Sequence, residues 1–126
     1  MAYFELEKAK SRCNIDPTDP SFDQLLNDFG TASDKEVDAL IYEIASKIRT
    51  NFQLPVLPLP SPSQDIKDAS TDRVVAKWWR KQKDYSAEKS YNDASKLAIT
   101  NWILMEKVDA QVYGIIIGGP DSQFTG

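Results

Sequence analysis

Three aspartates close together near the N-terminus are the first residues that could do chemistry. Asp16, Asp19 and Asp23 supply carboxylate oxygens, which are the ligands that calcium and magnesium take in proteins. Their spacing matches no calcium-binding loop, and Pro17 and Pro20 interrupt it. Because aspartate and proline are also typical turn residues, the stretch from Asp16 to Pro20 predicts a turn, with Asp19 or Ser21 as the N-cap of the next helix.

The sequence has no histidine and a single cysteine, Cys13. Lack of histidine removes the commonest general acid and base, the Ser–His and Cys–His nucleophile pairs, and the commonest metal ligand. One cysteine cannot form an internal disulfide or an all-cysteine metal site, and an intracellular origin fits this. We therefore expect a protein that is not an enzyme and that takes no cofactor and no metal.

A basic cluster surrounds two adjacent tryptophans and consists of Lys77, Trp78, Trp79, Arg80, Lys81 and Lys83. Such a pattern superficially resembles a stacking platform for single-stranded nucleic acid. However, cations favour a helix C-terminus, and the formal net charge of −4 opposes dedicated nucleic-acid binding. On a helix the two tryptophans lie about 100° apart, so one can enter the core while the other is a candidate anchor for a partner. The alternative that both complete the core stays open.

Helices must position these residues, because most of the chain carries a helical pattern. A first helix is expected to end near Arg12, and a short amphipathic one, from Phe22 to Phe29, to end at Gly30. The central helix is predicted from about Ser33 to about Asn51. Its start is a Ser33–Glu36 capping box and its buried stripe is Val37, Leu40, Ile41, Ile44, Ala45 and Ile48. One longer helix through Gly30 is the alternative.

A proline-rich connector ends the central helix, since Pro55, Pro58, Pro60 and Pro62 fix φ and lack N–H donors. Its apolar side chains would be costly to leave in water, at about 1.5–3 kcal/mol each if fully buried. We expect the connector to be extended and to pack along its own domain or a neighbouring subunit through Phe52, Leu54, Val56, Leu57 and Leu59. The PxxP pattern from Pro55 to Pro58 lacks flanking Arg or Lys, which favours a structural connector over a peptide ligand.

Two more helices are expected after the connector. Ser63 or Asp65 can cap the first, and Asp84 or Ser86 the second. The predicted stripe of the last helix, which we expect to pack centrally or against a partner, is Tyr91, Ala94, Leu97, Ala98, Trp102 and Met105, widened by Ile99, Ile103 and Leu104.

The C-terminal segment differs in composition from the helical region before it. Ile115, Ile116 and Ile117 are β-branched and lie between glycines. This segment either adds a strand to another chain or folds back on its own helices. We therefore divide the chain into a helical domain, residues 1–110, and a tail, residues 111–126.

The sequence thus predicts an all-α fold, a small bundle of about four helices with a Pro-rich extended connector and a β-prone C-terminal tail. No apolar stretch approaches the roughly 20 residues that span a bilayer, and the N-terminus lacks a basic region followed by an apolar run. We expect neither secretion through a signal peptide nor a place in a membrane.

Two strings give the chain a family likeness. Ile48-Arg-Thr-Asn-Phe-Gln-Leu-Pro55 ends a helix, and Tyr91-Asn-Asp-Ala-Ser-Lys-Leu97 opens a later one. Across roughly residues 33–105 this arrangement resembles the head-to-tail connector (adaptor, head completion) proteins of tailed phages, including the Mu-like group. The tryptophan pair and the Ile115–Ile117 tail do not map onto that pattern.

The resemblance implies a structural subunit that forms a ring of its own copies, dodecameric in the family, beneath the portal protein. Such a ring sits in the virion neck, is assembled in the host cytoplasm, extends the DNA channel and bridges to stopper, neck or tail-terminator proteins. Channel DNA would pass without sequence-specific binding. From the residues themselves, apart from the resemblance, the expected partner-binding residues are Phe52, Leu54, Val56, Leu57 and Leu59 of the connector, Trp78 and Trp79, and Ile115, Ile116 and Ile117.

A function of another class remains open. The chain could instead be a small regulatory adaptor that binds one partner protein through the tryptophan helix. Ring formation by many copies would distinguish the first function from a one-to-one complex.

Overall fold

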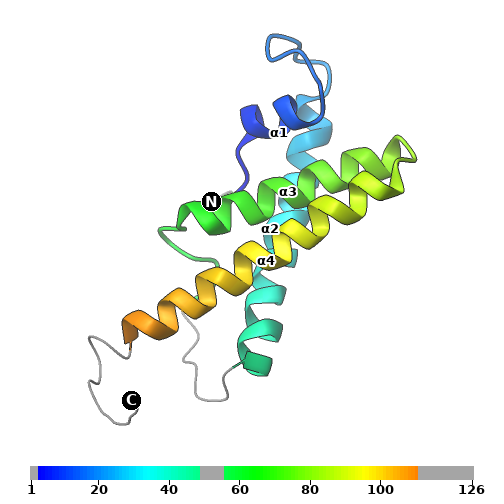
Figure 1. Cartoon of the computed structure of the whole chain (residues 1–126). Coiled ribbons are helices and arrows are strands. Elements are labelled where there is room, and N and C mark those ends of the chain that lie inside the picture. Colours follow the sequence, from blue (N-terminus) through cyan, green and yellow to red (C-terminus); the bar gives the residue numbers. More distant parts are fainter. Residues whose placement is uncertain (1–2, 49–55, 111–126) are drawn as a thin grey trace.

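The structure is a computed structural model that describes residues 3–48 and 56–110. These ranges form four helices and contain no strand, which confirms the predicted all-α class (Figure 1). The helices are α1 (Leu6–Arg12), α2 (Asp23–Ile48), α3 (Gln64–Lys81) and α4 (Tyr85–Ala110). Helices α3 and α4 form an antiparallel hairpin, and α2 crosses them while α1 packs at one end against α2 and α3 (Figure 1).

Helix α2 is one continuous helix, so the prediction of two helices broken at Gly30 is wrong and the longer alternative holds. A methyl group at Gly30 would overlap the ring of Phe4, which packs directly against the helix there. The glycine therefore makes room for an aromatic side chain instead of ending the helix. Ser33 is likewise no N-cap, because it is fully buried inside α2. Tertiary packing has overridden the local capping signals.

The predicted N-caps are confirmed at α3 and α4 but not at α2. Ser63 caps α3, with its Oγ accepting the Ile66 N–H at 3.4 Å, and Asp84 caps α4, with its Oδ1 accepting the Ala87 N–H at 3.0 Å. For α2 the prediction is wrong. The helix begins at Asp23, and the Asp19 carboxylate accepts the Ser21 N–H inside the preceding turn.

The core consists of two neighbouring clusters. One gathers apolar residues of α2, α3 and α4 with two residues from outside the helices, namely Val37, Ile41, Ala45, Ile66, Ala69, Ile99, Trp102, Ile103, Tyr3 and Leu59. The other joins α1 to α2 and α3 through Ala9, Cys13, Ile15, Leu26, Val74, Val75 and Trp78. Burial raises the pKa of the Cys13 thiol to about 12, so this cysteine is held as a neutral core residue.

Only part of the stripe predicted for α4 faces the core. Trp102 of that stripe is buried, as are Ile99 and Ile103 of its widened part, whereas Leu97 and Met105 are exposed. Ala94, also assigned to that stripe, is exposed too. The helix is apolar on both sides, so its periodicity alone does not say which side faces inward. None of the helices in the described ranges has the length and apolarity of a membrane span.

Candidate partner-binding site

The proline-rich connector is only partly available to a partner. Phe52 and Leu54 lie outside the described residues. Val56 is 81% exposed, Leu57 is half-buried against the core, and Leu59 is buried within it. Leu59, which the sequence analysis assigned to partner binding, therefore packs in the subunit's own interior, while Val56 is exposed.

Tyr3 fixes the end of this connector. Its Oη accepts the Leu59 N–H at 2.7 Å and donates to Asp38 Oδ1 at 2.7 Å. Its backbone N–H donates to the Asp34 carboxylate at 3.1 and 3.2 Å. Burial, reinforced by the hydrogen bond to Asp38, raises the pKa of Tyr3 well above its ordinary value, so the hydroxyl stays protonated. One buried phenol thus joins the N-terminus, α2 and the connector.

The two tryptophans pack within the subunit to different degrees. Trp78 is buried and meets the ring of Phe22 edge to face, with centroids 5.1 Å apart. Trp79 is half-buried against the same cluster. The expectation of one core and one marginal tryptophan agrees with this placement, and Trp78 is the one in the core. Ile115, Ile116 and Ile117 lie outside the described residues.

The outward side of α4 carries exposed apolar side chains, which the sequence analysis placed in one wide stripe expected to pack centrally or against a partner. We define the outer face of α4 as Ala94, Leu97, Asn101, Leu104 and Met105, all of them exposed. Leu97 is 61% and Met105 58% exposed, and Leu104 is also open to solvent. Exposed apolar side chains that gather on one helix face make that face a candidate surface for association.

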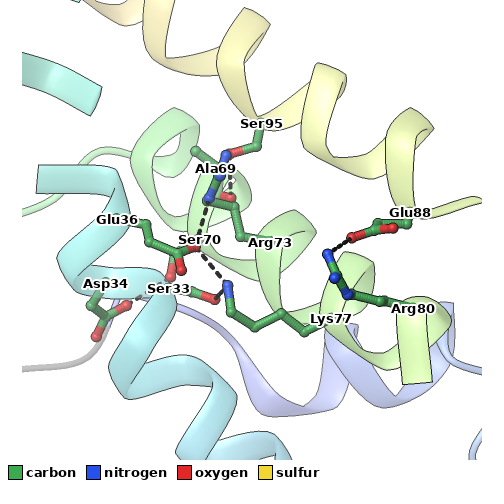
Figure 2. A network of polar contacts seen from close by, with 10 residues as sticks. All are labelled: Ser33, Asp34, Glu36, Ala69, Ser70, Arg73, Lys77, Arg80, Glu88 and Ser95. Atoms are coloured by element: carbon green, nitrogen blue, oxygen red, sulfur yellow. Dashed lines mark hydrogen bonds and ion pairs between the residues drawn. The ribbon is translucent and has the colours of Figure 1, made fainter. Parts of the chain in front are cut away.

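A polar network between α2, α3 and α4 sets the rotation of α4 (Figure 2). Glu36 Oε1 accepts from Lys77 Nζ at 2.6 Å and from Arg73 Nε at 3.0 Å. Arg73 also donates to Ser95 Oγ at 3.4 Å, and the Ser95 hydroxyl donates to the Ala69 carbonyl at 2.8 Å. Since Ser95 is fully buried, this contact places the opposite side of α4 in solvent.

Two cations, Lys77 and Arg73, share the single carboxylate of Glu36 in this network. Partial burial by itself would raise the pKa of Glu36, but the hydrogen bonds and charges of Lys77 and Arg73 lower it overall. The fully buried Ser33 hydroxyl accepts from Lys77 Nζ at 3.2 Å. Ion pairing of this kind orients helices, so we interpret the network as the clamp that positions the outer face.

A second ion pair ties the α3–α4 hairpin together near its turn. Arg80 donates to Glu88 Oε2 at 3.2 Å, beside the short link between the helices (Figure 2). The Arg80 side chain is largely exposed, so this ion pair contributes little to stability.

The three N-terminal aspartates are engaged in local structure. Asp16 accepts from the Thr18 N–H at 2.9 Å, which confirms the predicted turn. Asp23 pairs at 2.8 Å with Lys10, whose buried ammonium also donates to the carbonyls of Pro17 and Asp19. In the described ranges no group of three or more acidic, cysteine or histidine side chains is arranged to hold a metal ion.

Asp72 should make stability depend on pH. Burial raises its pKa from 3.8 to about 6, although Arg12, 2.7 Å away, acts in the opposite direction. The folded protein then binds the Asp72 proton more tightly than the unfolded chain does. The stability that this proton adds is fully present below about pH 4 and is lost as the pH rises through 6. As the pH is raised from 4 to 7, the free energy of unfolding of Asp72→Asn should rise by about 2–3 kcal/mol relative to that of wild type, as measured by urea unfolding. If wild type instead becomes more stable relative to the variant as the pH rises, the ion pair with Arg12 outweighs the effect of burial on Asp72.

Sequence reasoning did not separate the outer face of α4 from its buried face, and it missed the clamp that positions the helix. The signal for the clamp was present, because Arg73 and Lys77 lie four residues apart on an otherwise apolar side of α3. For α4 the signal was a second apolar row, Ala94, Leu97 and Leu104, offset from the row of Ile99 and Ile103. Both rows were merged into one wide stripe.

Comparison of the chain with family models, with curated proteins and with solved structures finds no significant match. The interpretation of the site therefore rests on the residues and contacts described above.

Proposed function

We propose that this protein is a structural subunit of a phage neck, a head-tail connector whose copies form a ring beneath the portal protein. In this role it extends the DNA channel, bridges to stopper, neck or tail-terminator proteins, and catalyses no reaction. The order of its parts supports the proposal: a long helix, a proline-rich connector and a helical hairpin, as in the resemblance that spans residues 33–105.

The observation that carries the proposal is the distribution of exposed large apolar side chains. In the described ranges they include Tyr42 on α2, Val56 in the connector, and Leu97 and Met105 on α4. A subunit in a closed ring needs two different surfaces for its two neighbours, and further surfaces for the components above and below. Several separate apolar sites suit that requirement better than a single patch does.

The charge of the chain suits a channel that DNA passes through. A formal net charge of −4 weakens non-specific attachment to the phosphate backbone, which is driven by basic side chains. The protein would therefore line or support the channel without binding a particular sequence.

The alternative, an adaptor that uses the tryptophan helix, has less support. Trp78 is enclosed by Phe22 and its cluster, so it cannot serve as an anchor without leaving the core. Only Trp79 remains partly open.

Electron microscopy of the protein mixed with purified portal rings of the encoding phage tests the proposal. We expect an added layer of density with the symmetry of the portal. A control without portal rings shows whether the copies close into a ring by themselves. Portal rings that stay bare, together with a one-to-one complex with some other protein, would overturn the proposal.

A further inference from the structure

The outer face of α4 has the spacing of a coiled-coil seam. Ala94, Leu97, Asn101 and Leu104 follow one another at alternating intervals of three and four residues, the heptad pattern of positions a and d. All four are exposed. On a helix they lie on the side opposite Ile99 and the other buried residues of α4, so the seam faces away from its own subunit.

We propose that two copies of this chain pair through this seam, with their α4 helices parallel and in register. The occupant of the seam is then a second copy of the same protein. The inference concerns the free protein and does not depend on the proposed ring.

Asn101 is the residue that selects this occupant. It falls at position a, and its amide offers both donors and an acceptor, so it can hydrogen-bond to Asn101 of a second copy. A single asparagine at position a is a well-attested way to fix register and a two-stranded state. A purely apolar partner helix would leave this amide buried without a partner, which is unfavourable.

The same amide selects the parallel orientation. In a parallel pair, position a meets position a, and Asn101 meets its own copy. An antiparallel pair would set Asn101 against Leu97 twice and leave two amides unsatisfied. Ion pairs at the exposed rim of an antiparallel pair would stabilise it by less than the two buried, unsatisfied amides destabilise it, because exposed ion pairs contribute little.

The charges beside the seam are compatible with a second copy. In the parallel pair, Asp93 of one copy faces Ala98 of the other, and Thr100 faces Met105. No like charges are brought together at these positions, although the chain as a whole is acidic. The uncharged seam is therefore a place where two copies can approach.

A seam this short suffices because α4 is already folded. Isolated helices must be ordered on pairing, which short sequences rarely achieve. Here α3 holds α4 through Ser95, Ile99 and Ile103, so pairing has only to join two preformed surfaces.

Sedimentation equilibrium of the full chain tests the pairing. We expect wild type to reach the mass of two chains at about 100 µM, and Leu97→Lys to weaken association at least about tenfold. Tyr85→Lys is the matched control, because Tyr85 is as exposed as Leu97 but lies at the start of α4, outside the seam, and it should pair as wild type does. Thermal unfolding of each variant checks that it is folded. A wild type that stays monomeric at this concentration, or a Leu97→Lys variant that pairs unchanged, would overturn the proposal.

A charge exchange at position 101 tests the orientation. Asn101→Asp and Asn101→Lys should each pair more weakly than wild type, because each sets like charges face to face. Mixed together, they should associate at least about tenfold more tightly than either does alone. Equal association of the mixture and the separate variants would show that the two residues do not meet, and the parallel pair would be wrong.

Discussion

Replacing Ile99 with alanine is expected to lower the free energy of unfolding by about 2–5 kcal/mol. Ile99 is fully buried in the cluster that joins α2, α3 and α4. Truncation removes buried apolar surface and leaves a cavity, because Ile41, Trp102 and the other neighbours are held by their own contacts. Urea unfolding followed by circular dichroism measures the loss.

Leu97→Ala is the matched control, since Leu97 is two residues away on the same helix and 61% exposed. We expect a change within about 0.5 kcal/mol at protein concentrations where the chain is monomeric. If Leu97→Ala instead costs as much as Ile99→Ala, α4 is rotated relative to the structure, and its outer face is not free.

Tyr3→Ala is expected to destabilise the protein by about 3–5 kcal/mol, which is typical of a buried aromatic side chain. The ring is buried in the larger core cluster, and its hydroxyl satisfies the buried Leu59 N–H. Loss of Tyr3 therefore removes core packing and releases the end of the proline-rich connector.

Tyr3→Phe separates these two effects, because it retains the ring and removes only the hydroxyl. An unsatisfied buried N–H at Leu59 should cost about 1–3 kcal/mol. Hydrogen exchange should show faster exchange of the Leu59 amide in the variant. A Tyr3→Phe protein with wild-type stability and unchanged exchange at Leu59 would contradict the role given to the hydroxyl.

Local signals in the sequence predicted most of the helices. Ser63 and Asp84 cap the helices that they were expected to cap, because each side chain meets an N–H only three residues ahead. The turn at Asp16 is predicted for the same reason. Interactions of this range are contained in a few adjacent residues.

What could not be predicted depends on residues distant in sequence. Gly30 lies inside α2 because Phe4 packs on it, and Ser33 is buried because Lys77 of α3 reaches it. The rotation of α4 depends on Ser95 and its contact with Ala69. A helix with two apolar sides offers two solutions, and only the tertiary contacts decide between them.

The candidate site shows the same difference between local sequence signals and contacts between residues that are distant in sequence. Hydrophobicity alone selected Leu59 and Trp78 as partner-binding residues, yet both complete the core of their own subunit. Val56 and Leu97 are similar in character and are exposed. Which apolar residues remain free for a partner is set by the packing of the whole bundle.

The number of copies bound to each portal ring is the most direct test of the proposed function. Native mass spectrometry of the complex formed with purified portal rings gives this number. The proposal predicts one saturating layer with as many copies of this chain as the ring symmetry requires. A single copy on each partner protein, at any excess of the chain, would contradict it.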